Sequence, residues 1–328
     1  MLLPRTVMKE TTKRLTEVEK RPPLRDEEIA LAVKDVPSRF HHPLESIVKK
    51  YEGSGTTNNW KLVDWSKPIS REEDQKFSCD FTQYERSELC VHSFKDIVSD
   101  HIRRNRHWPD CLILPRLWKE NGVADDNSLY IEIGANIGSC VLEMLLSTNA
   151  SVVAFEPHPM NVYNIKKTLS KLGKSYQDRL LLFPIGLGKS ESISTIYSGS
   201  ENMGNSQIGQ AVKDWDSQTF DQLPVYIERL DSVLDATKID KIRLVKMDAQ
   251  GFECNVVDGM GVLAKKMIGI KFEHEPKFLH AQGCVDLVSR IRRLGFKVFK
   301  DNLSTEMTED PVTIVKGVEL YAQHQATR

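Results

Sequence analysis

The sequence lacks a long apolar run, an excess of charge of either sign and any closely spaced cysteine pair. No uninterrupted apolar stretch approaches the roughly 18 residues that a membrane span needs, so we expect no membrane span. The 45 Lys and Arg against 46 Asp and Glu give a net charge of −1, which offers no electrostatic argument for binding nucleic acid. With 328 residues, 40% of them hydrophobic, the chain is long enough for a substantial core.

Cysteine is scarce, and none of it stands in a C-x-x-C pair. The six cysteines lie far apart, at positions 79, 90, 111, 140, 254 and 284. Such sparse thiols predict reduced cysteines rather than a disulfide framework or a zinc site. Residues 1–5 lack the apolar region of a signal peptide, and Leu2 excludes an N-myristoyl glycine. We therefore expect a cytoplasmic protein.

The N-terminal quarter differs in composition from the rest of the chain. Residues 1–25 are charged and contain three prolines, which is typical of a mobile tail. Apolar residues at helical spacing predict short helices over 26–36 and 43–52, and the polar stretch 53–59 predicts a linker. We divide the chain into a partly disordered extension with short helices (1–75), an N-terminal cap segment of the core (76–127) and a core domain (128–322).

Apolar segments alternate with amphipathic helical patterns throughout the core domain. The segments predicted as strands are 128–134, 151–156, 180–185, 242–248, 267–272 and 296–299. Strands that are apolar on both faces and alternate with such helices predict a parallel sheet covered on both sides, which is a doubly wound, Rossmann-like α/β fold. The polar stretch 188–223 is much longer than the usual connection, so we expect a functional loop or lid there.

The first predicted strand runs into a glycine-containing turn. In doubly wound sheets the ligand lies beyond the carboxyl ends of the strands, where residues 132–138 read Glu-Ile-Gly-Ala-Asn-Ile-Gly. A dinucleotide-binding fingerprint would need glycine where Asn136 and Ser139 stand, which disfavours a nicotinamide-dependent oxidoreductase. Gly134 lets the chain turn and a ligand approach the backbone, and Glu132 suits a cationic ligand group better than a pyrophosphate.

A second carboxylate follows the next strand. Glu156 lies 22 residues after Gly134, at the position where an acidic side chain accepts hydrogen bonds from a ribose diol. A ribose-bearing ligand with a positive, phosphate-free end indicates S-adenosylmethionine. The alternative is that Glu132 and Glu156 only cap the helices that follow them.

Three segments, at 131–138, 153–159 and 245–253, resemble the motifs of the FkbM-type class I methyltransferases, over roughly residues 125–300. The resemblance implies a seven-stranded sheet with one antiparallel strand, S-adenosylmethionine as the methyl donor and, commonly, O-methylation of a sugar or polyketide hydroxyl. It would make 128–322 a class I methyltransferase domain. The chain departs from the family in having Glu132 where Asp is more common and Gln250 where Glu is common, which puts acid–base chemistry at position 250 in doubt.

The resemblance also assigns the cofactor contacts by position. Gly134, Ala135, Asn136 and Gly138 would line the methionine part, Glu156 would hold the ribose, Pro157 and His158 would flank the adenosine, and Gly186 and Leu187 would lie near the adenine. With Glu132, these residues make up the predicted cofactor site.

Methyl transfer to a hydroxyl also needs a proton acceptor. Asp248 ends the fourth predicted strand, and His274, between Glu273 and Glu275, closes the fifth, so we predict Asp248 and His274 as catalytic residues. The alternatives are that these carboxylates are solvated and the histidine packs at a strand end, or that Asp248 holds a divalent ion with one of 273–275. Because no dedicated ligand spacing is present, we predict no metal.

The favoured function is S-adenosylmethionine-dependent O-methylation of a hydroxyl on a sugar, glycan or other small molecule, with no nucleic acid as partner. An N-methyltransferase typically carries an Asn/Asp-Pro-Pro-aromatic element after the fourth strand, and residues 248–251 read Asp-Ala-Gln-Gly instead. A non-catalytic S-adenosylmethionine-binding module is the remaining alternative.

Overall fold

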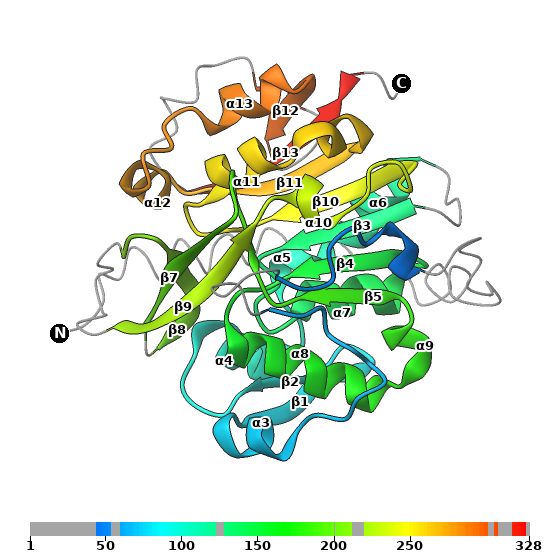
Figure 1. The fold of residues 1–328 in the computed structure, drawn as a ribbon, viewed down its shortest axis with the longest axis vertical. Coiled ribbons are helices and arrows are strands. Elements are labelled where there is room, and N and C mark those ends of the chain that lie inside the picture. Colours follow the sequence, from blue (N-terminus) through cyan, green and yellow to red (C-terminus); the bar gives the residue numbers. More distant parts are fainter. Residues whose placement is uncertain are drawn as a thin grey trace.

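The centre of the protein is a sheet of seven strands in the order β12-β13-β11-β10-β3-β4-β5 (Figure 1). The computed structural model describes residues 44–53, 60–122, 128–199, 201–211, 220–300, 305–307 and 317–325. The strands are β3 (Ser128–Ile133), β4 (Ser151–Phe155), β5 (Leu180–Phe183), β10 (Lys241–Met247), β11 (Gly269–His274), β12 (Phe296–Lys300) and β13 (Val318–His324). Strand β13 runs antiparallel to both of its neighbours, and the other pairs are parallel. The predicted doubly wound fold with one antiparallel strand is confirmed.

Helices cover both faces of this sheet because its strands are apolar on both sides. One face carries α5 (Pro109–Leu112), α6 (Leu114–Glu120), α7 (Ser139–Ser147) and α8 (Pro159–Leu172). The other carries α10 (Leu230–Val233), α11 (Glu253–Gly259), the 3-10 helix η2 (Gly261–Lys266) and α13 (Leu287–Arg293), with α12 (Pro276–Ala281) just after β11. Side chains alternate between the two cores along β10, where Leu244 packs toward α7 and Val245 toward α11.

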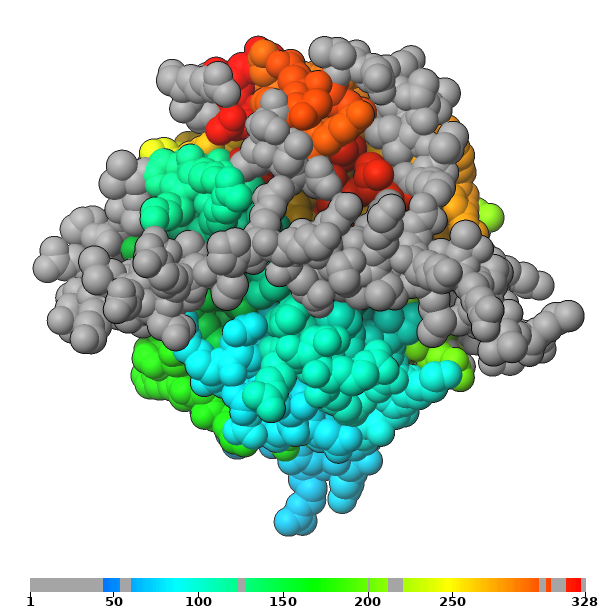
Figure 2. All heavy atoms as spheres, turned by 180° about the vertical axis from the view of Figure 1, so that it is seen from behind, coloured from blue at the N-terminus to red at the C-terminus, as the bar shows by residue number. Residues whose placement is uncertain are grey.

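A smaller layer lies outside α7 and α8. It contains α3 (Arg71–Lys76), the hairpin of β1 (Cys79–Tyr84) and β2 (Ser87–His92), and α4 (Ile97–Asn105), with the short α9 (Lys174–Gln177) after α8. Apolar side chains of the hairpin and α4 form a separate core with α7. This layer and the α13–β12 region occupy opposite ends of the molecule in both overall views (Figures 1 and 2).

The long polar insertion folds into strands rather than a loop. Strands β6 (Gly186–Leu187), β7 (Ser192–Gly199), β8 (Asn202–Ile208) and β9 (Phe220–Glu228) form a second sheet in the order β6-β9-β7-β8. Four buried aliphatic side chains, Ile196, Ile208, Val225 and Ile227, hold it together. Residues 200 and 212–219 of the insertion lie outside the described part.

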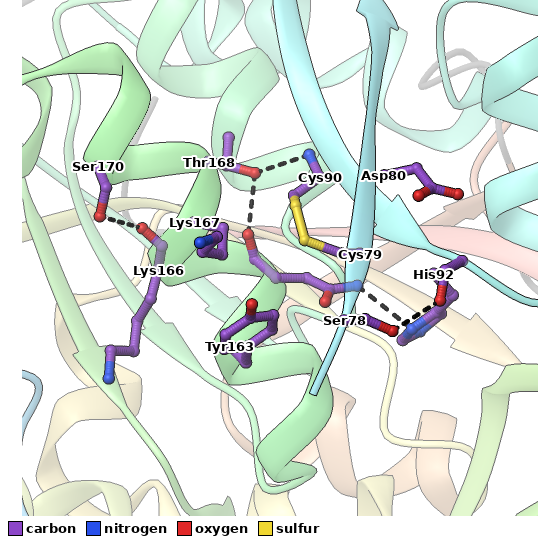
Figure 3. Close-up of a disulfide and its surroundings, with 12 residues drawn as sticks. Ser78, Cys79, Asp80, Cys90, His92, Tyr163, Lys166, Lys167, Thr168 and Ser170 are labelled. Atoms are coloured by element: carbon purple, nitrogen blue, oxygen red, sulfur yellow. Dashed lines mark hydrogen bonds between the residues drawn. A yellow bond between two sulfur atoms is a disulfide. The ribbon is translucent and has the colours of Figure 1, made fainter. Parts of the chain in front are cut away.

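The prediction of six reduced cysteines is wrong. The structure pairs them as Cys79–Cys90, Cys111–Cys140 and Cys254–Cys284. The first disulfide joins β1 to β2 beside α8, where the Thr168 hydroxyl accepts a hydrogen bond from the Cys90 amide at 3.0 Å (Figure 3). The partners stand 11, 29 and 30 residues apart, so the tertiary fold brings them together and no local motif reveals them. Because disulfides persist mainly in oxidising compartments, the cysteines no longer support a cytoplasmic location.

The N-terminal extension is attached to the core where the structure describes it. The 3-10 helix η1 (Leu44–Ile47) lies within the predicted helix 43–52 and buries Ile47 in the main core. Trp60 is buried there as well, and its indole donates a hydrogen bond to Glu228 at 3.0 Å. The predicted tail, the helix at 26–36 and most of the linker lie outside the described residues.

Candidate active site

The glycine turn after β3 brings two strand ends into contact. Gly134 has φ +82°, and a Cβ at this position would lie 2.0 Å from the Asp248 carbonyl oxygen. Asn136 also has a positive φ, +51°, and the turn ends at Gly138, where a Cβ would lie 2.7 Å from Ile165 Cγ1. Glycine at 134 and 138 is therefore required by the close approach of β10 and α8.

Glu156 binds this turn from the end of β4. Its Oε2 accepts a hydrogen bond from the Asn136 amide at 2.7 Å, and its Oε1 accepts from the His158 amide at 2.8 Å and from Asn161 Nδ2 at 3.2 Å. Burial raises the pKa of Glu156 to about 7, although these hydrogen bonds favour the charged form. The carboxylate thus joins the turn after β3 to the first turn of α8.

A cavity of about 600 Å³, counting the space open to solvent, lies between these loops and the second sheet. The strands and loops of the central sheet and the helices that cover it contribute to its lining Ile133, Gly134, Asn136, Phe155, Glu156, Pro157, Asn161, Ile185, Asp248, Ala249, Gln250, Phe252 and Val256. The second sheet contributes Gly186, Leu187, Ile196, Met203, Gly204, Ser206 and Ile208. The cavity therefore has a mainly apolar wall with carboxylates and amides at the strand ends, which is typical of a small-molecule site.

The second sheet is anchored on both sides of the cavity. The Met203 amide donates to Asp96 Oδ1 at 2.9 Å, and Asp96 also caps α4 by accepting from the Ser99 amide at 2.8 Å. On the other side, Gln282 Nε2 donates to the carbonyl oxygens of Ile208 at 2.8 Å and Gln210 at 3.1 Å. The expected lid is thus a β-sheet with fixed edges.

Charged side chains lie in a row along the carboxyl end of the central strands. Lys246 Nζ lies 3.2 Å from Glu132 Oε1 and 3.3 Å from Asp248 Oδ2, and the Tyr130 hydroxyl donates to Glu132. Beyond Lys246, Lys271 of β11 pairs with Glu319 of β13. The partners meet because β3, β10, β11 and β13 are adjacent in the sheet.

Asp248 is the member of this row that lines the cavity. Burial by itself would raise the pKa of Asp248, but Lys246 and a hydrogen bond from the Gln250 amide at 2.6 Å hold that pKa below its usual range. The ammonium of Lys246, which burial disfavours, is kept charged by Asp248 and Glu132, and its pKa is raised. Asp248 is therefore an ionised carboxylate at neutral pH.

The structure brings seven of the predicted site residues to the cavity and places the others elsewhere. Gly134, Asn136, Glu156, Pro157, Gly186, Leu187 and Asp248 line it. Ala135 and Gly138 belong to the same turn, outside the lining. Glu132 is 1% exposed and forms the ion pair with Lys246 rather than facing the cavity.

The two predicted histidines are also outside the lining. His158 caps α8, where its Nδ1 accepts from the Met160 amide at 3.3 Å, and burial lowers its pKa to about 4. His274 lies on β11 on the same side as Phe272, which packs in the α11 core. Its Nδ1 has no hydrogen-bond partner among the described residues, and burial lowers its pKa.

Sequence reasoning missed Asn161, Lys246 and the apolar wall. Asn161 lies in the first turn of α8, five residues after Glu156, and its buried Oδ1 has no hydrogen-bond partner in the described part of the chain. A polar side chain in the first helical turn after a strand-end acid is a feature that could have indicated it. Lys246 could not be found in this way, because its role depends on pairing with Glu132 across two strands.

Within the described ranges, no group of three or more His, Cys, Asp or Glu side chains is arranged to hold a metal ion. No helix of the described part combines the length and the apolar character that crossing a bilayer requires.

Three solved structures similar to this chain are methyltransferases. The precorrin-6y C5,15-methyltransferase of Geobacter metallireducens is 12% identical, with 77% of this chain and 95% of that chain covered and a TM-score of 0.34. The METTL16 methyltransferase domain is 11% identical, with 66% and 68% covered and a TM-score of 0.36. The Thermus thermophilus 16S rRNA N2 G1207 methyltransferase RsmC, solved with AdoMet and guanosine, is 11% identical, with 76% and 50% covered and a TM-score of 0.35. Similarity this low carries no argument about the acceptor.

No curated protein sequence matches the chain. The model of the methyltransferase FkbM domain matches residues 132–298, which is half of the chain and includes the glycine turn, Glu156 and Asp248. The chain therefore belongs to the FkbM methyltransferase family and is an S-adenosylmethionine-dependent methyltransferase.

Proposed function

We propose that this protein transfers a methyl group from S-adenosylmethionine to a hydroxyl of a sugar, glycan or other small molecule. The observation that carries the proposal is the cavity that the Gly134 turn and Glu156 line together with Asp248 and Gln250. One side of this cavity suits a nucleoside and the other a polar acceptor.

The residues around the glycine turn fit S-adenosylmethionine. Glu156 would accept hydrogen bonds from the ribose hydroxyls, and the orphaned Asn161 Oδ1 offers a further acceptor beside it. At Gly186 a Cβ would lie 2.8 Å from Ile227 Cδ1, so glycine leaves room for this side chain beside the position where the adenine is expected. When bound, S-adenosylmethionine supplies a methyl group that its sulfonium has already activated.

The carboxylate at the end of β10, Asp248, supports a hydroxyl as the acceptor. Asp248 is ionised and accepts hydrogen bonds, so it would bind and orient an acceptor hydroxyl, while its negative charge matches the sulfonium. The turn at 248–251 lacks the proline-aromatic element typical of amino-group methyltransferases. The overall charge of −1 favours a small molecule or glycan over nucleic acid.

Calorimetry with the purified protein tests the first half of the proposal. S-adenosylmethionine and S-adenosylhomocysteine should bind at micromolar Kd, and NAD should not bind at comparable concentrations. Binding of NAD alone would overturn the assignment.

Methyl transfer tests the second half. Tritiated S-adenosylmethionine should label a panel of methyl glycosides and polyols, whereas transfer to RNA or to primary amines in place of these compounds would establish another acceptor class. Tight S-adenosylmethionine binding without transfer to any of them would favour the non-catalytic module.

A further inference from the structure

The side-chain amide of Gln250 joins two carboxylates at the edge of the cavity. Its Nε2 lies 2.6 Å from Asp248 Oδ1 and 2.9 Å from Glu273 Oε2. Gln250 has φ +51° and is followed by Gly251 at φ +98°, where a Cβ would lie 2.7 Å from the Phe278 carbonyl oxygen. This tight turn places the amide between the end of β10 and the end of β11.

The other end of the same amide is unpaired. Gln250 is 8% exposed and lines the cavity, and its Oε1 has no hydrogen-bond partner among the described residues. A buried carbonyl oxygen without a donor costs free energy, which an acceptor hydroxyl would recover by donating to it. Gln250 therefore connects the cavity to Glu273.

The two carboxylates held by Gln250 have different surroundings. Both oxygens of Asp248 are occupied, one by Gln250 and the other by Lys246, which lies 3.3 Å away. The structure gives the Glu273 carboxylate one hydrogen bond, from Gln250, within the described residues. Glu273 is thus the carboxylate with the capacity to take a proton.

Charges from every neighbouring element act on Glu273. It faces Asp248 after β10, Glu253 of α11, Glu319 of β13 and Asp110 of α5, and the nearby Lys271 is paired with Glu319. Burial raises the pKa of Glu273 well above its usual range, and Asp248 and the other carboxylates add to this increase. A pair of carboxylates whose pKa values are pushed apart in this way is typical of acid–base sites.

His274, the other group considered for this role, lies on the opposite side of β11. Successive side chains of a strand point to opposite faces, so Glu273 shares a face with Lys271 and His274 shares one with Phe272. Gln250 donates a hydrogen bond to Glu273, and among the described residues none joins it to His274.

We propose that Glu273 is the final acceptor of the proton of the acceptor hydroxyl, and that Gln250, which lines the cavity and holds Glu273 beside Asp248, passes this proton to it. As the hydroxyl oxygen forms its bond to the methyl carbon, its proton passes to Gln250 Oε1 while an Nε2 proton of Gln250 passes to Glu273 Oε2. This leaves the side chain of Gln250 in its imidic acid form, which returns to the amide when Oε1 loses its proton to solvent and Glu273 gives its proton back to Nε2. The electron pair of the breaking carbon–sulfur bond stays on the sulfur. This inference rests on the proposed O-methylation.

The first experiment needs no acceptor. In protein labelled with 13C at the glutamate side-chain carboxyl, the resonance missing from Glu273→Gln is followed from pH 4 to 10 by NMR. This resonance should titrate at a higher pH than those of the exposed glutamates. In Gln250→Leu the pKa of Glu273 should rise further, because its carboxylate loses the hydrogen bond that Gln250 donates. Glu275→Gln serves as the control. The Glu275 side chain caps α12 by accepting a hydrogen bond from the Lys277 amide, so its replacement should leave the titration of Glu273 unchanged.

An ordinary titration of Glu273 near pH 4.5, or one insensitive to Gln250→Leu, would overturn the proposal. Because S-adenosylmethionine binding is measured separately, these outcomes are distinct from a failure of the proposed function, in which the wild-type protein would not bind it.

The second experiment uses tritiated methyl transfer to the methyl glycosides labelled by the wild-type protein. In the wild-type protein kcat should rise with pH as Glu273 loses its proton. Glu273→Gln should lower kcat at least a hundredfold and abolish this rise, while the Kd for S-adenosylmethionine stays within threefold of the wild-type value. His274→Gln should keep both kcat and the pH profile. Retention of the pH-dependent rise in Glu273→Gln, or its loss in His274→Gln, would refute the assignment.

Discussion

Glu156→Gln is the substitution that most directly tests how the cofactor site is built. The carboxylate holds the Asn136 amide through Oε2, and the His158 amide and Asn161 through Oε1. Glutamine keeps the shape and one acceptor oxygen, so the hydrogen bonds at Oε1 survive. Its amide nitrogen cannot accept from Asn136, and it offers the ribose a donor where an acceptor is needed.

The expected loss follows from the hydrogen bonds removed. A hydrogen bond to a charged partner contributes about 1.5–3 kcal/mol, and each 1.4 kcal/mol is a factor of ten in Kd. Replacing the ribose-binding carboxylate should therefore weaken S-adenosylmethionine binding by about 10- to 150-fold. The loss should be the same for S-adenosylhomocysteine, because the ribose is common to both.

Calorimetry at pH 8 is the appropriate assay, because burial raises the pKa of Glu156 to about 7 and the carboxylate is ionised above that value. Glu143→Gln is a matched control, since Glu143 is also a buried glutamate, bonded to Ser147 on α7 and outside the cavity lining. Its variant should bind as the wild type does. Equal affinity of Glu156→Gln and wild type, with both folded by circular dichroism, would refute the placement of the ribose.

Three further predictions concern stability. Burial raises the pKa of Glu253 from 4.5 to about 8, so the folded state loses stability as the pH rises between these values. Glu253→Gln should therefore raise Tm relative to wild type more at pH 8 than at pH 5, and a difference in Tm that does not depend on pH would contradict this. Alkylation and mass spectrometry should find six blocked cysteines before reduction and six labelled ones after it, and reduction should lower the free energy of unfolding by about 3–4 kcal/mol for each loop of 29 or 30 residues. Deleting residues 1–60 removes Ile47 and Trp60 from the core, so the free energy of unfolding measured by chemical denaturation should fall by at least about 3 kcal/mol. An unchanged free energy of unfolding would contradict this prediction.

The cofactor side of the site could be predicted from the sequence because its residues are close together along the chain. Gly134, Asn136 and Glu156 lie on consecutive strand–helix turns, and the family motif includes them. Strand ends of a parallel sheet share one edge, so such turns meet in every doubly wound fold.

The acceptor side depends on contacts that composition and periodicity do not encode. Lys246 pairs with Glu132 only in the register that β3 and β10 adopt, and Gln250 reaches Glu273 through a turn with two positive φ values. Strand alternation does separate Glu273 from His274, but the sequence does not say which of them faces Gln250. The antiparallel β13 follows a segment outside the described residues, and its seven residues show no distinctive pattern.

Two of the disulfides, which the sequence did not predict, lie beside the loops after β3 and β10 that line the cavity. Cys140 is the second residue of α7, two positions after Gly138, and its partner Cys111 lies in α5. Cys254 is likewise the second residue of α11, which begins just after Gly251. Two of the three disulfides therefore fix the helices that start at the glycine turn and at the Asp248 turn. A site that must align a donor with an acceptor needs its loops held to within a fraction of an ångström, and cross-links placed behind both loops limit the movement of each against the sheet.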